Sequence, residues 1–297
     1  MIKKNQVENI CKKLNTKLIA YKFLAKGNHN INYVLETDKE KFVLRIENNK
    51  QFKNLKKEYK LLKSLSLGLA PKVFLFDSSR KIIEMDYLIE EFIEGIHPPN
   101  KPTDNFVITM AKWFKELHKN KRKTKPYSVK SAVKPYYNNY LKYKQYINNI
   151  TLSKKLEMCI NKGLKICIEN NKIFSDRKLC SLLHNDSSRE NIFYKKDKVK
   201  LIDWEFAGYG MPEREIVYFI DSYILSRKQI KLFLKSYGYP NTSVSRKKLY
   251  IFYLILLFSS IGYSLWSLGL TKKIKEKNNR LLKDINLLEK LLSGQMF

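Results

Sequence analysis

The chain has 297 residues, enough for one large domain or two lobes. Hydrophobic residues make up 44% and charged residues 29% of the sequence, a globular composition that excludes a disordered or fibrous protein. The formal net charge is +30. Lysine far outnumbers arginine, and the basic residues are spread along the whole chain. We therefore interpret most of this charge as solvated surface and expect no nucleic-acid partner. Binding of an anionic ligand is still an open alternative.

The four cysteines, Cys11, Cys159, Cys167 and Cys180, show neither CxxC spacing nor a disulfide framework. This usage predicts reduced thiols and a cytoplasmic protein. The N-terminal segment MIKKNQVENICKKLN lacks the apolar core of a secretory signal. It predicts an amphipathic helix with Val7, Ile10 and Leu14 on one face.

The first third of the sequence predicts a small antiparallel sheet around one main helix. Apolar runs alternate with turn residues, and DKE between two of the runs predicts a hairpin. The predicted strands are Leu18–Leu24, Ile31–Thr37, Lys41–Glu47, Lys72–Phe76 and Tyr87–Ile93. The helix is predicted from the spacing of Phe52, Leu55, Tyr59 and Leu62.

The segment GIHPPNKPT, Gly95–Thr103, contains three prolines and predicts a boundary. Beyond it, apolar residues recur at helical spacing over 106–117 and 156–168. A loop and hairpin are expected around His184–Asp203, followed by helices to the C-terminus. We therefore expect an N-terminal lobe over residues 1–94 and a larger, mostly helical C-terminal lobe over 95–297.

The apolar stretch Leu249–Leu270, LYIFYLILLFSSIGYSLWSLGL, has no charged side chain and is long enough to cross a bilayer. A helix that is apolar on all sides is also typical of a buried core helix. We favour the core helix and expect no integral membrane span, because the small residues Ser259, Ser260 and Gly262 let neighbouring helices approach. A membrane anchor is the alternative.

The stretch LLHNDSSRENIFYKKDKVKLIDWEFAG, Leu182–Gly208, carries the most chemical information. Asp186 and Asn191, five residues apart on one loop, can place a carboxylate and an amide oxygen around a common point. Asp203 follows an apolar strand of the adjacent hairpin and brings a second carboxylate. Such hard oxygen ligands suit Mg²⁺, which shares substrate phosphates, and phosphoryl transfer needs a site of this kind.

HNDSSRENIFY followed by LIDWEFAG resembles the catalytic loop and metal-binding segment of the LicA-like choline/ethanolamine kinases and their aminoglycoside phosphotransferase relatives, within the protein-kinase-like superfamily. The resemblance implies an α+β, bilobal protein-kinase-like fold with ATP and Mg²⁺ as cofactors. It also implies a role for five residues of this stretch. These are Asp186 as the catalytic base that also contacts the acceptor, Asn191 and Asp203 as Mg²⁺ ligands, His184 as a brace of the loop, and Glu205 as a supporting residue.

The nucleotide side is expected in the N-terminal lobe. Gly27 lies between two predicted strands, as a phosphate-covering loop should, and Asn28 adds a donor. The resemblance implies that Arg45 in KFVLRIE contacts the ATP phosphates and that Glu58 is its partner on the following helix. Period-2 alternation places Arg45 with Val43, opposite Phe42, Leu44 and Ile46. YLIEEFIEG resembles the segment linking the lobes, where backbone groups hold adenine, and this implies contacts from Glu91, Phe92 and Ile93.

The C-terminal part is expected to hold the acceptor. Choline kinases carry W-x-x-W on a late helix, and this chain has YSLW, with Tyr263 at the first aromatic position and Trp266 at the second. A core aromatic pair is the alternative from the pattern alone. The acid that faces the amine in choline kinases would align with Ser222, and the nearest acid is Asp221. Where the family usually has Asp, twelve residues after Asp203, this chain has Glu215.

These observations predict an ATP-dependent kinase for the hydroxyl of choline or ethanolamine. A same-fold phosphotransferase for an aminoglycoside, thiamine or another small alcohol is the close alternative. A non-catalytic binder of nucleic acid or an anionic membrane is the alternative from a different class.

Overall fold

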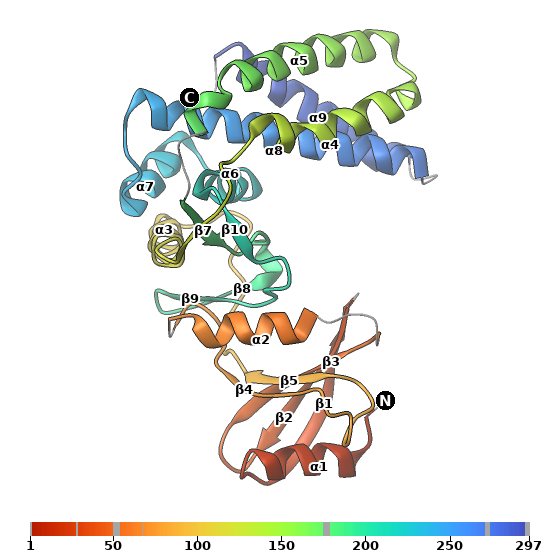
Figure 1. Cartoon of the computed structure of the whole chain (residues 1–297), viewed down its shortest axis with the longest axis vertical. Coiled ribbons are helices and arrows are strands. Elements are labelled where there is room, and N and C mark those ends of the chain that lie inside the picture. Colours follow the sequence, from red (N-terminus) through yellow and green to blue (C-terminus); the bar gives the residue numbers. More distant parts are fainter. Residues whose placement is uncertain are drawn as a thin grey trace. The chain divides into compact units, whose positions relative to one another are not determined.

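The computed structural model describes residues 2–27, 29–49, 54–66, 68–174, 179–270 and 274–294. The chain divides into two compact units, each built from two stretches of sequence. The first contains residues 1–117 and 184–207, and the second contains 118–183 and 208–297. Figure 1 labels the elements of both units.

A five-stranded antiparallel sheet forms the main part of the first unit, in the order β1-β2-β3-β5-β4. Its strands are β1 (Leu18–Lys26), β2 (Asn30–Thr37), β3 (Lys41–Glu47), β4 (Val73–Asp77) and β5 (Tyr87–Glu91). β2 and β3 form the expected hairpin, in which Leu35 lies opposite Phe42. Two helices accompany the sheet, α1 (Lys4–Lys13) and α2 (Asn54–Ser64). The predicted helix starts near Phe52, which lies outside the described residues.

The two faces of β3 have different roles, as the alternation predicts. Phe42, Leu44 and Ile46 are buried in an apolar cluster with residues of α1 such as Val7 and Ile10. Arg45 points the other way, into a cavity described below. One strand therefore supplies both the core and a charged side chain for the site.

The first unit also contains α3 (Asp104–Leu117) and the hairpin of β8 (Ile192–Lys195) and β9 (Lys198–Leu201). Trp113 of α3 donates a hydrogen bond to the carbonyl of Leu69 and packs against Trp204 at a ring distance of 6.1 Å. Both indoles are buried. These contacts attach the segment that follows β9, which carries Asp203, to α3.

The second unit is mostly helical, as expected. It contains a three-stranded sheet in the order β10-β7-β6 and several helices. The strands are β6 (Lys121–Lys123), β7 (Leu179–Leu183) and β10 (Gly208–Gly210). The helices are α4 (Val129–Tyr143), α5 (Ile150–Glu169), α6 (Pro212–Ser222), α7 (Arg227–Tyr237), α8 (Ser243–Leu270) and α9 (Ile274–Leu292).

The apolar stretch forms most of α8, and α8 packs against α4, α6 and α9. It is the one helix in the described residues that is long and apolar enough to cross a membrane, and about two-thirds of its most apolar window is buried by the rest of the protein. Leu254, Ile261 and Leu265 have no exposed surface. The burial matches the predicted core helix.

The α+β fold class predicted from the sequence is confirmed, with an antiparallel sheet near the N-terminus and a helical C-terminal part. The compact units do not test where a nucleotide-binding function ends. The lobes at 1–94 and 95–297 therefore stay a prediction.

Candidate active site

A cavity of about 800 Å³ opens on the sheet of the first unit. Residues from the β1–β2 turn, β3, β5, the segment after β5 and the segment after β9 line it. Its lining includes seven residues expected at the site from the sequence, which are Gly27, Arg45, Glu91, Phe92, Ile93, Asp203 and Glu205. Five of these were predicted to bind the nucleotide, whereas Glu58, predicted with them, is not part of the lining.

Arg45 lies at the centre of the charged end of this cavity. Its side chain is buried, and Nη1 lies 2.6 Å from Glu58 Oε1, so the ion pair expected from the sequence is present. Nη2 lies 3.7 Å from Asp203 Oδ1. Burial disfavours the guanidinium charge, but the carboxylates of Glu58 and Glu90 outweigh it and raise the pKa of Arg45. A fixed cation therefore faces the cavity.

Glu90 is a third carboxylate beside Arg45, and no sequence pattern predicts it there. It is 4% exposed, and its Oε2 lies 3.5 Å from Arg45 Nη1. Burial, together with the nearby Glu58 charge, raises the pKa of Glu90 to about 7 against the attraction of Arg45. Glu90 is therefore divided between its neutral and charged forms near neutral pH.

Glu205 contacts the turn that contains Gly27. Its Oε2 lies 2.6 Å from His29 Nδ1, across 176 residues of sequence. Gly27 N donates to the carbonyl of Asn30 at 2.9 Å, which closes the turn. Asn28 lies outside the described residues. Glu205, predicted to support the metal or order a loop, thus holds the turn between β1 and β2.

The catalytic loop predicted from the sequence lies in the same unit. Asn191 donates through Nδ2 to Asp186 Oδ2 at 2.9 Å and to the Asp186 carbonyl at 3.1 Å. The two side chains therefore meet, as their five-residue spacing predicts. Among the described residues, no hydrogen bond is made to the second Asp186 oxygen or to the amide oxygen of Asn191, so both can contact other groups.

His184 is fully buried beneath this loop. Its ring packs against Trp204 at 4.5 Å, Nδ1 accepts from the Asp186 backbone N–H at 3.3 Å, and Nε2 lies 3.0 Å from the carbonyl of Ile202. Because Nδ1 accepts, the proton is on Nε2, which donates to Ile202. His184 thus ties the loop to the strand end before Asp203, and it is placed to brace the loop rather than to transfer protons.

Asp203 adopts a left-handed backbone conformation, with φ of 62°. Desolvation raises the pKa of Asp203 to about 6 against the pull of Arg45, and the carboxylates of Glu58, Glu205 and Asp186 add to the rise. This surplus of negative charge is what a divalent cation would neutralise. Oxygens from Asp203 and Asn191 are the hard ligands that Mg²⁺ prefers, so the residues present fit the ion.

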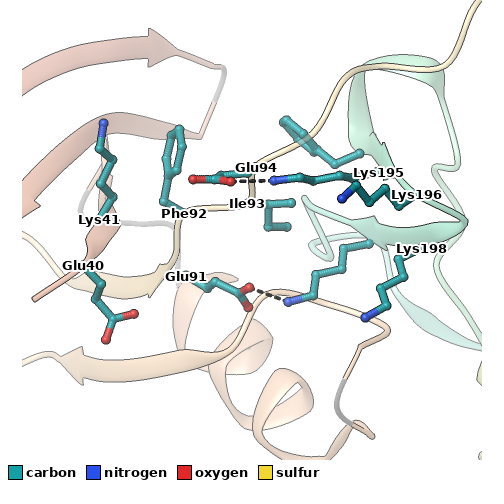
Figure 2. Close-up of a pocket in the computed structure, with 11 residues that line it drawn as sticks. Glu40, Lys41, Glu91, Phe92, Ile93, Glu94, Lys195, Lys196 and Lys198 are labelled. Atoms are coloured by element: carbon teal, nitrogen blue, oxygen red, sulfur yellow. Dashed lines mark hydrogen bonds and ion pairs between the residues drawn. The ribbon is translucent and has the colours of Figure 1, made fainter.

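A second cavity, of about 670 Å³, lies along the segment after β5 (Figure 2). It shares Glu91, Phe92, Ile93 and Glu94 with the first cavity. Two ion pairs, Glu91–Lys200 at 2.5 Å and Glu94–Lys195 at 2.7 Å, attach this segment to the β8–β9 hairpin (Figure 2). The carboxylates of Glu91 and Glu94 therefore point toward lysines of the hairpin. The backbone groups of the segment are then the ones that can contact a ligand.

The residues predicted to hold the acceptor belong to the second unit. Tyr263 and Trp266 lie on α8 with their rings 5.6 Å apart, and they are 54% and 39% exposed. The guanidinium of Arg280 lies 5.8 Å from the Tyr263 ring centre. Because these rings are exposed on a helix that is otherwise mostly buried, they are not a core aromatic pair. Their surface attracts a cation.

Asp221 accepts a hydrogen bond from Tyr253 of α8 at 2.5 Å. Glu215 is buried against His118, with 2.9 Å between Glu215 Oε2 and His118 Nε2. Glu215 is thus engaged in the interior of the second unit. Its longer side chain reaches a histidine that the sequence did not indicate.

These features define the class of the protein. A buried arginine faces a cavity and lies 3.7 Å from Asp203, and the same unit contains the hydrogen-bonded pair of Asp186 and Asn191. A cation that holds phosphates, oxygen ligands that suit Mg²⁺ and a carboxylate base are the components of a phosphoryl-transfer site. The model of the phosphotransferase enzyme family matches residues 20–246, more than half of the chain. The chain belongs to this family, and the resemblance indicated by the motifs is confirmed at that level.

Two relatives similar in sequence are both LicA homologues. A LicA homologue of Mycoplasma capricolum is 24% identical over 244 residues, which cover 79% of this chain and 87% of that protein. A LicA homologue of Metamycoplasma hominis is 30% identical over 175 residues, 58% of this chain and 62% of that protein.

Solved structures share the fold. A choline kinase from Cryptosporidium parvum is 17% identical with a TM-score of 0.67, over 99% of this chain and 98% of that one. A spectinomycin phosphotransferase in complex with ADP and spectinomycin is 14% identical with a TM-score of 0.66, over 99% of both chains. LicA in complex with AMP is 18% identical with a TM-score of 0.59, over 97% and 98%. The protein-kinase-like fold expected from the sequence is therefore present, and the chain is a phosphotransferase of that fold.

Proposed function

We propose that this protein transfers the γ-phosphoryl group of ATP to the hydroxyl group of choline or ethanolamine. The observation that carries the proposal is the Arg45–Asp203 contact at the end of the cavity, in the same unit as the hydrogen-bonded pair of Asp186 and Asn191. The similarity to LicA homologues and to a choline kinase supports the choice of acceptor. Family membership favours this enzyme over a non-catalytic binding protein.

In this proposal, ATP occupies the 800 Å³ cavity, a volume within the range of small-molecule sites. Backbone groups of Glu91, Phe92 and Ile93 hold the adenine, and Arg45 holds the phosphates. Similar structures contain AMP or ADP, which supports the use of a nucleotide. The turn fixed by His29 and Glu205 covers the phosphates and excludes water.

Asp186 orients the acceptor hydroxyl and accepts its proton. The hydroxyl oxygen forms a bond to the γ-phosphorus while the bond between that phosphorus and the β–γ bridging oxygen breaks, which leaves ADP. Asn191 holds one Asp186 oxygen by its hydrogen bond and leaves the other for the substrate. Bound to Asn191 and Asp203, Mg²⁺ would supply positive charge to neutralise the phosphate oxygens.

The acceptor is assigned to the second unit. Tyr263 and Trp266 receive the ammonium group through their exposed rings, because aromatic faces attract cations. Asp221 is the nearest acid for the same group, although its carboxylate is held by Tyr253. The proposal includes a cytoplasmic location, which the four buried free thiols support.

The Asp186→Asn variant tests the catalytic assignment. We expect turnover with ATP and choline to fall by about 10²- to 10⁴-fold, because the amide cannot accept the proton. The unfolding temperature should hardly change. Glu190→Gln, on the same loop but exposed, is the matched control and should keep its turnover. Full activity of Asp186→Asn would contradict the mechanism.

A further inference from the structure

A third cavity, of about 950 Å³, lies in the second unit between α7 and the start of α8. Figure 1 labels α7 and α8 in the second unit. Ile230 and Leu234 of α7, Tyr239 after it and Leu249 of α8 give the cavity an apolar lining. The capping box of Ser226 and Gln229 and the left-handed Gly238, with φ of 78°, fix the two ends of α7. The cavity is therefore built on well-formed helices.

The rest of the lining is strongly basic. Arg227, Lys231 and Lys235 stand four residues apart on α7, on one face of the helix, and Arg246 joins them from α8. None of the described residues that line the cavity is acidic. Within the described part of the chain, Lys231 and Lys235 form no ion pair, so their charges are available to an anionic ligand.

This patch departs from the even spread of charge over the rest of the chain. No Asp or Glu occurs between Asp221 and Glu276, although the whole sequence has 28 acidic residues. In the same stretch, α7 and the first turns of α8 carry seven basic residues, which are Arg227, Lys228, Lys231, Lys235, Arg246, Lys247 and Lys248. Along the sequence, the basic residues of this region are therefore not interspersed with acids.

Exposed apolar side chains flank the basic residues. Ile224, just before α7, is 77% exposed, and Val244, in the first turn of α8, is 51% exposed. Ile224 also has a left-handed backbone, with φ of 49°, which is costly for a β-branched residue. An exposed isoleucine in this costly backbone conformation, three residues before a basic helix, is unusual for a surface that contacts only water.

We propose that α7 and the first turns of α8 form a docking surface for an anionic membrane, with the cavity receiving the acidic headgroup of a lipid and Ile224 and Val244 entering the interface. Basic side chains around an apolar centre are what an anionic bilayer surface attracts. Nucleic acid fits less well, because a phosphate backbone needs no apolar cavity and no exposed aliphatic side chains. The docking is peripheral and independent of the proposed kinase activity.

Sedimentation with lipid vesicles tests the docking surface. The full-length protein should sediment with vesicles of phosphatidylcholine that contain about one third phosphatidylglycerol, and should stay in solution with phosphatidylcholine alone. Binding should weaken as salt is raised, since surface charges are screened. Binding to neither kind of vesicle, or equal binding to both, would overturn the proposal.

A charge-reversed pair locates the surface. Lys231→Glu/Lys235→Glu should weaken binding to anionic vesicles by about thirtyfold or more, since each lysine near such a surface contributes on the order of a fivefold change. Lys130→Glu/Lys134→Glu is the matched control, an exposed i,i+4 pair on α4 with the same change of net charge. Unfolding temperatures report that each variant is folded. Equal losses in the two pairs would show a general charge effect and contradict the proposal.

A third variant separates a membrane from a soluble polyanion. Ile224→Asn should bind anionic vesicles several-fold more weakly while its unfolding temperature stays equal or rises, because Asn tolerates the left-handed backbone. Unchanged vesicle binding by Ile224→Asn would contradict the proposed insertion of Ile224 into the membrane interface. Duplex DNA is the comparison ligand, and binding to DNA without vesicle binding, lost in Lys231→Glu/Lys235→Glu, would overturn the proposal in favour of nucleic acid.

Discussion

Glu90 shows how burial and charge compete at one residue of the site. Its carboxyl is nearly inaccessible to water and lies near Arg45, which is already paired with Glu58. The Arg45 guanidinium thus lies close to more than one carboxylate. The free-energy cost of burying the Glu90 carboxyl is smallest when that carboxyl is protonated and neutral. The pKa of Glu90 accordingly rises from its usual 4.5 to about 7.

Stability should therefore depend on pH through Glu90. Between about pH 4.5 and pH 7 the folded protein keeps a proton that the unfolded chain has released, so the free energy of unfolding falls as pH rises, by a few kcal/mol at most. Glu90→Gln should reduce this fall. Urea unfolding at pH 5, 6 and 7, followed by tryptophan fluorescence, measures it. Glu91→Gln is the neighbouring control, and an equal reduction in both variants would contradict the assignment to Glu90.

Trp266 should contribute to acceptor binding through its exposed ring. Trp266→Ala should raise KM for choline by about 2- to 30-fold, the range given by loss of one cation–π contact. KM for ATP should not change, because the residues assigned to ATP lie in the first unit. Steady-state kinetics with each substrate varied in turn measures both constants. An equal rise in the two KM values would indicate a structural effect of the substitution.

Some site contacts could be predicted from the sequence and others could not. The pairing of Arg45 with Glu58 was implied by the resemblance to choline kinases, and strand alternation indicated only the face on which Arg45 lies. Asp186 and Asn191 share one loop. The His29–Glu205 contact spans 176 residues, and nothing in either local pattern points to the other. Nothing in the local pattern places the Glu90 side chain beside Arg45. The register of β5 against β3 does so, because it sets Glu90 opposite Val43, which shares a face of β3 with Arg45.

At the scale of helices, α5 and α8 pack through a glycine. A Cβ atom on Gly163 of α5 would lie 2.7 Å from Phe258 Cζ, and Phe258 is buried. On Gly262 of α8, the nearest atom would lie 3.5 Å away, which is an ordinary contact. The two glycines therefore differ in what an added methyl group would meet.

The two alanine substitutions should have opposite effects on stability. Alanine gains about 1 kcal/mol over glycine in a helix, so Gly262→Ala should stabilise the second unit slightly. At Gly163 the overpacking cost of about 1–3 kcal/mol should exceed that gain, so Gly163→Ala should be destabilising. Unfolding temperatures of the two variants measure the difference. Stabilisation by both would mean that Phe258 moves aside freely.

Element types were predictable because strand alternation and helical spacing are strong in this chain. The period-2 pattern identified β2 and β3, and the uninterrupted apolar run identified α8. The sequence left two interpretations of α8 open, a buried core helix and a membrane-spanning helix, since both kinds of helix have a similar apolar composition. The packing of α4, α6 and α9 against α8 favours the core helix, and these contacts between distant segments can be seen only in the three-dimensional structure.

At the scale of the whole molecule, the chain crosses between its two units more than once. Residues 184–207 return to the first unit after 118–183 have built part of the second. The catalytic loop and the sheet thus belong to one compact unit although about 90 residues separate Glu91 from Asp186 in sequence. A boundary drawn at the proline-rich segment could not anticipate this return, because composition does not report where a chain folds back.

The net charge also has meaning at this scale. Most of the +30 is dispersed, as the sequence suggests, but the acid-free stretch over α7 and α8 concentrates part of it around one cavity. The value of the net charge does not indicate where on the chain the basic residues are concentrated. The positions of the acidic residues do, because none lies between Asp221 and Glu276.

The most direct measurement of the central claim is phosphate transfer by the purified protein. Incubated with ATP and Mg²⁺, it should release ADP with choline or ethanolamine and give the corresponding phosphate ester, identified by mass spectrometry. Spectinomycin and thiamine, offered in parallel, should be poor acceptors, and Asp186→Asn should form the ester about 10²- to 10⁴-fold more slowly. Turnover of another alcohol with none of choline or ethanolamine would contradict the proposed acceptor. An absence of ADP release with every acceptor would contradict the kinase itself.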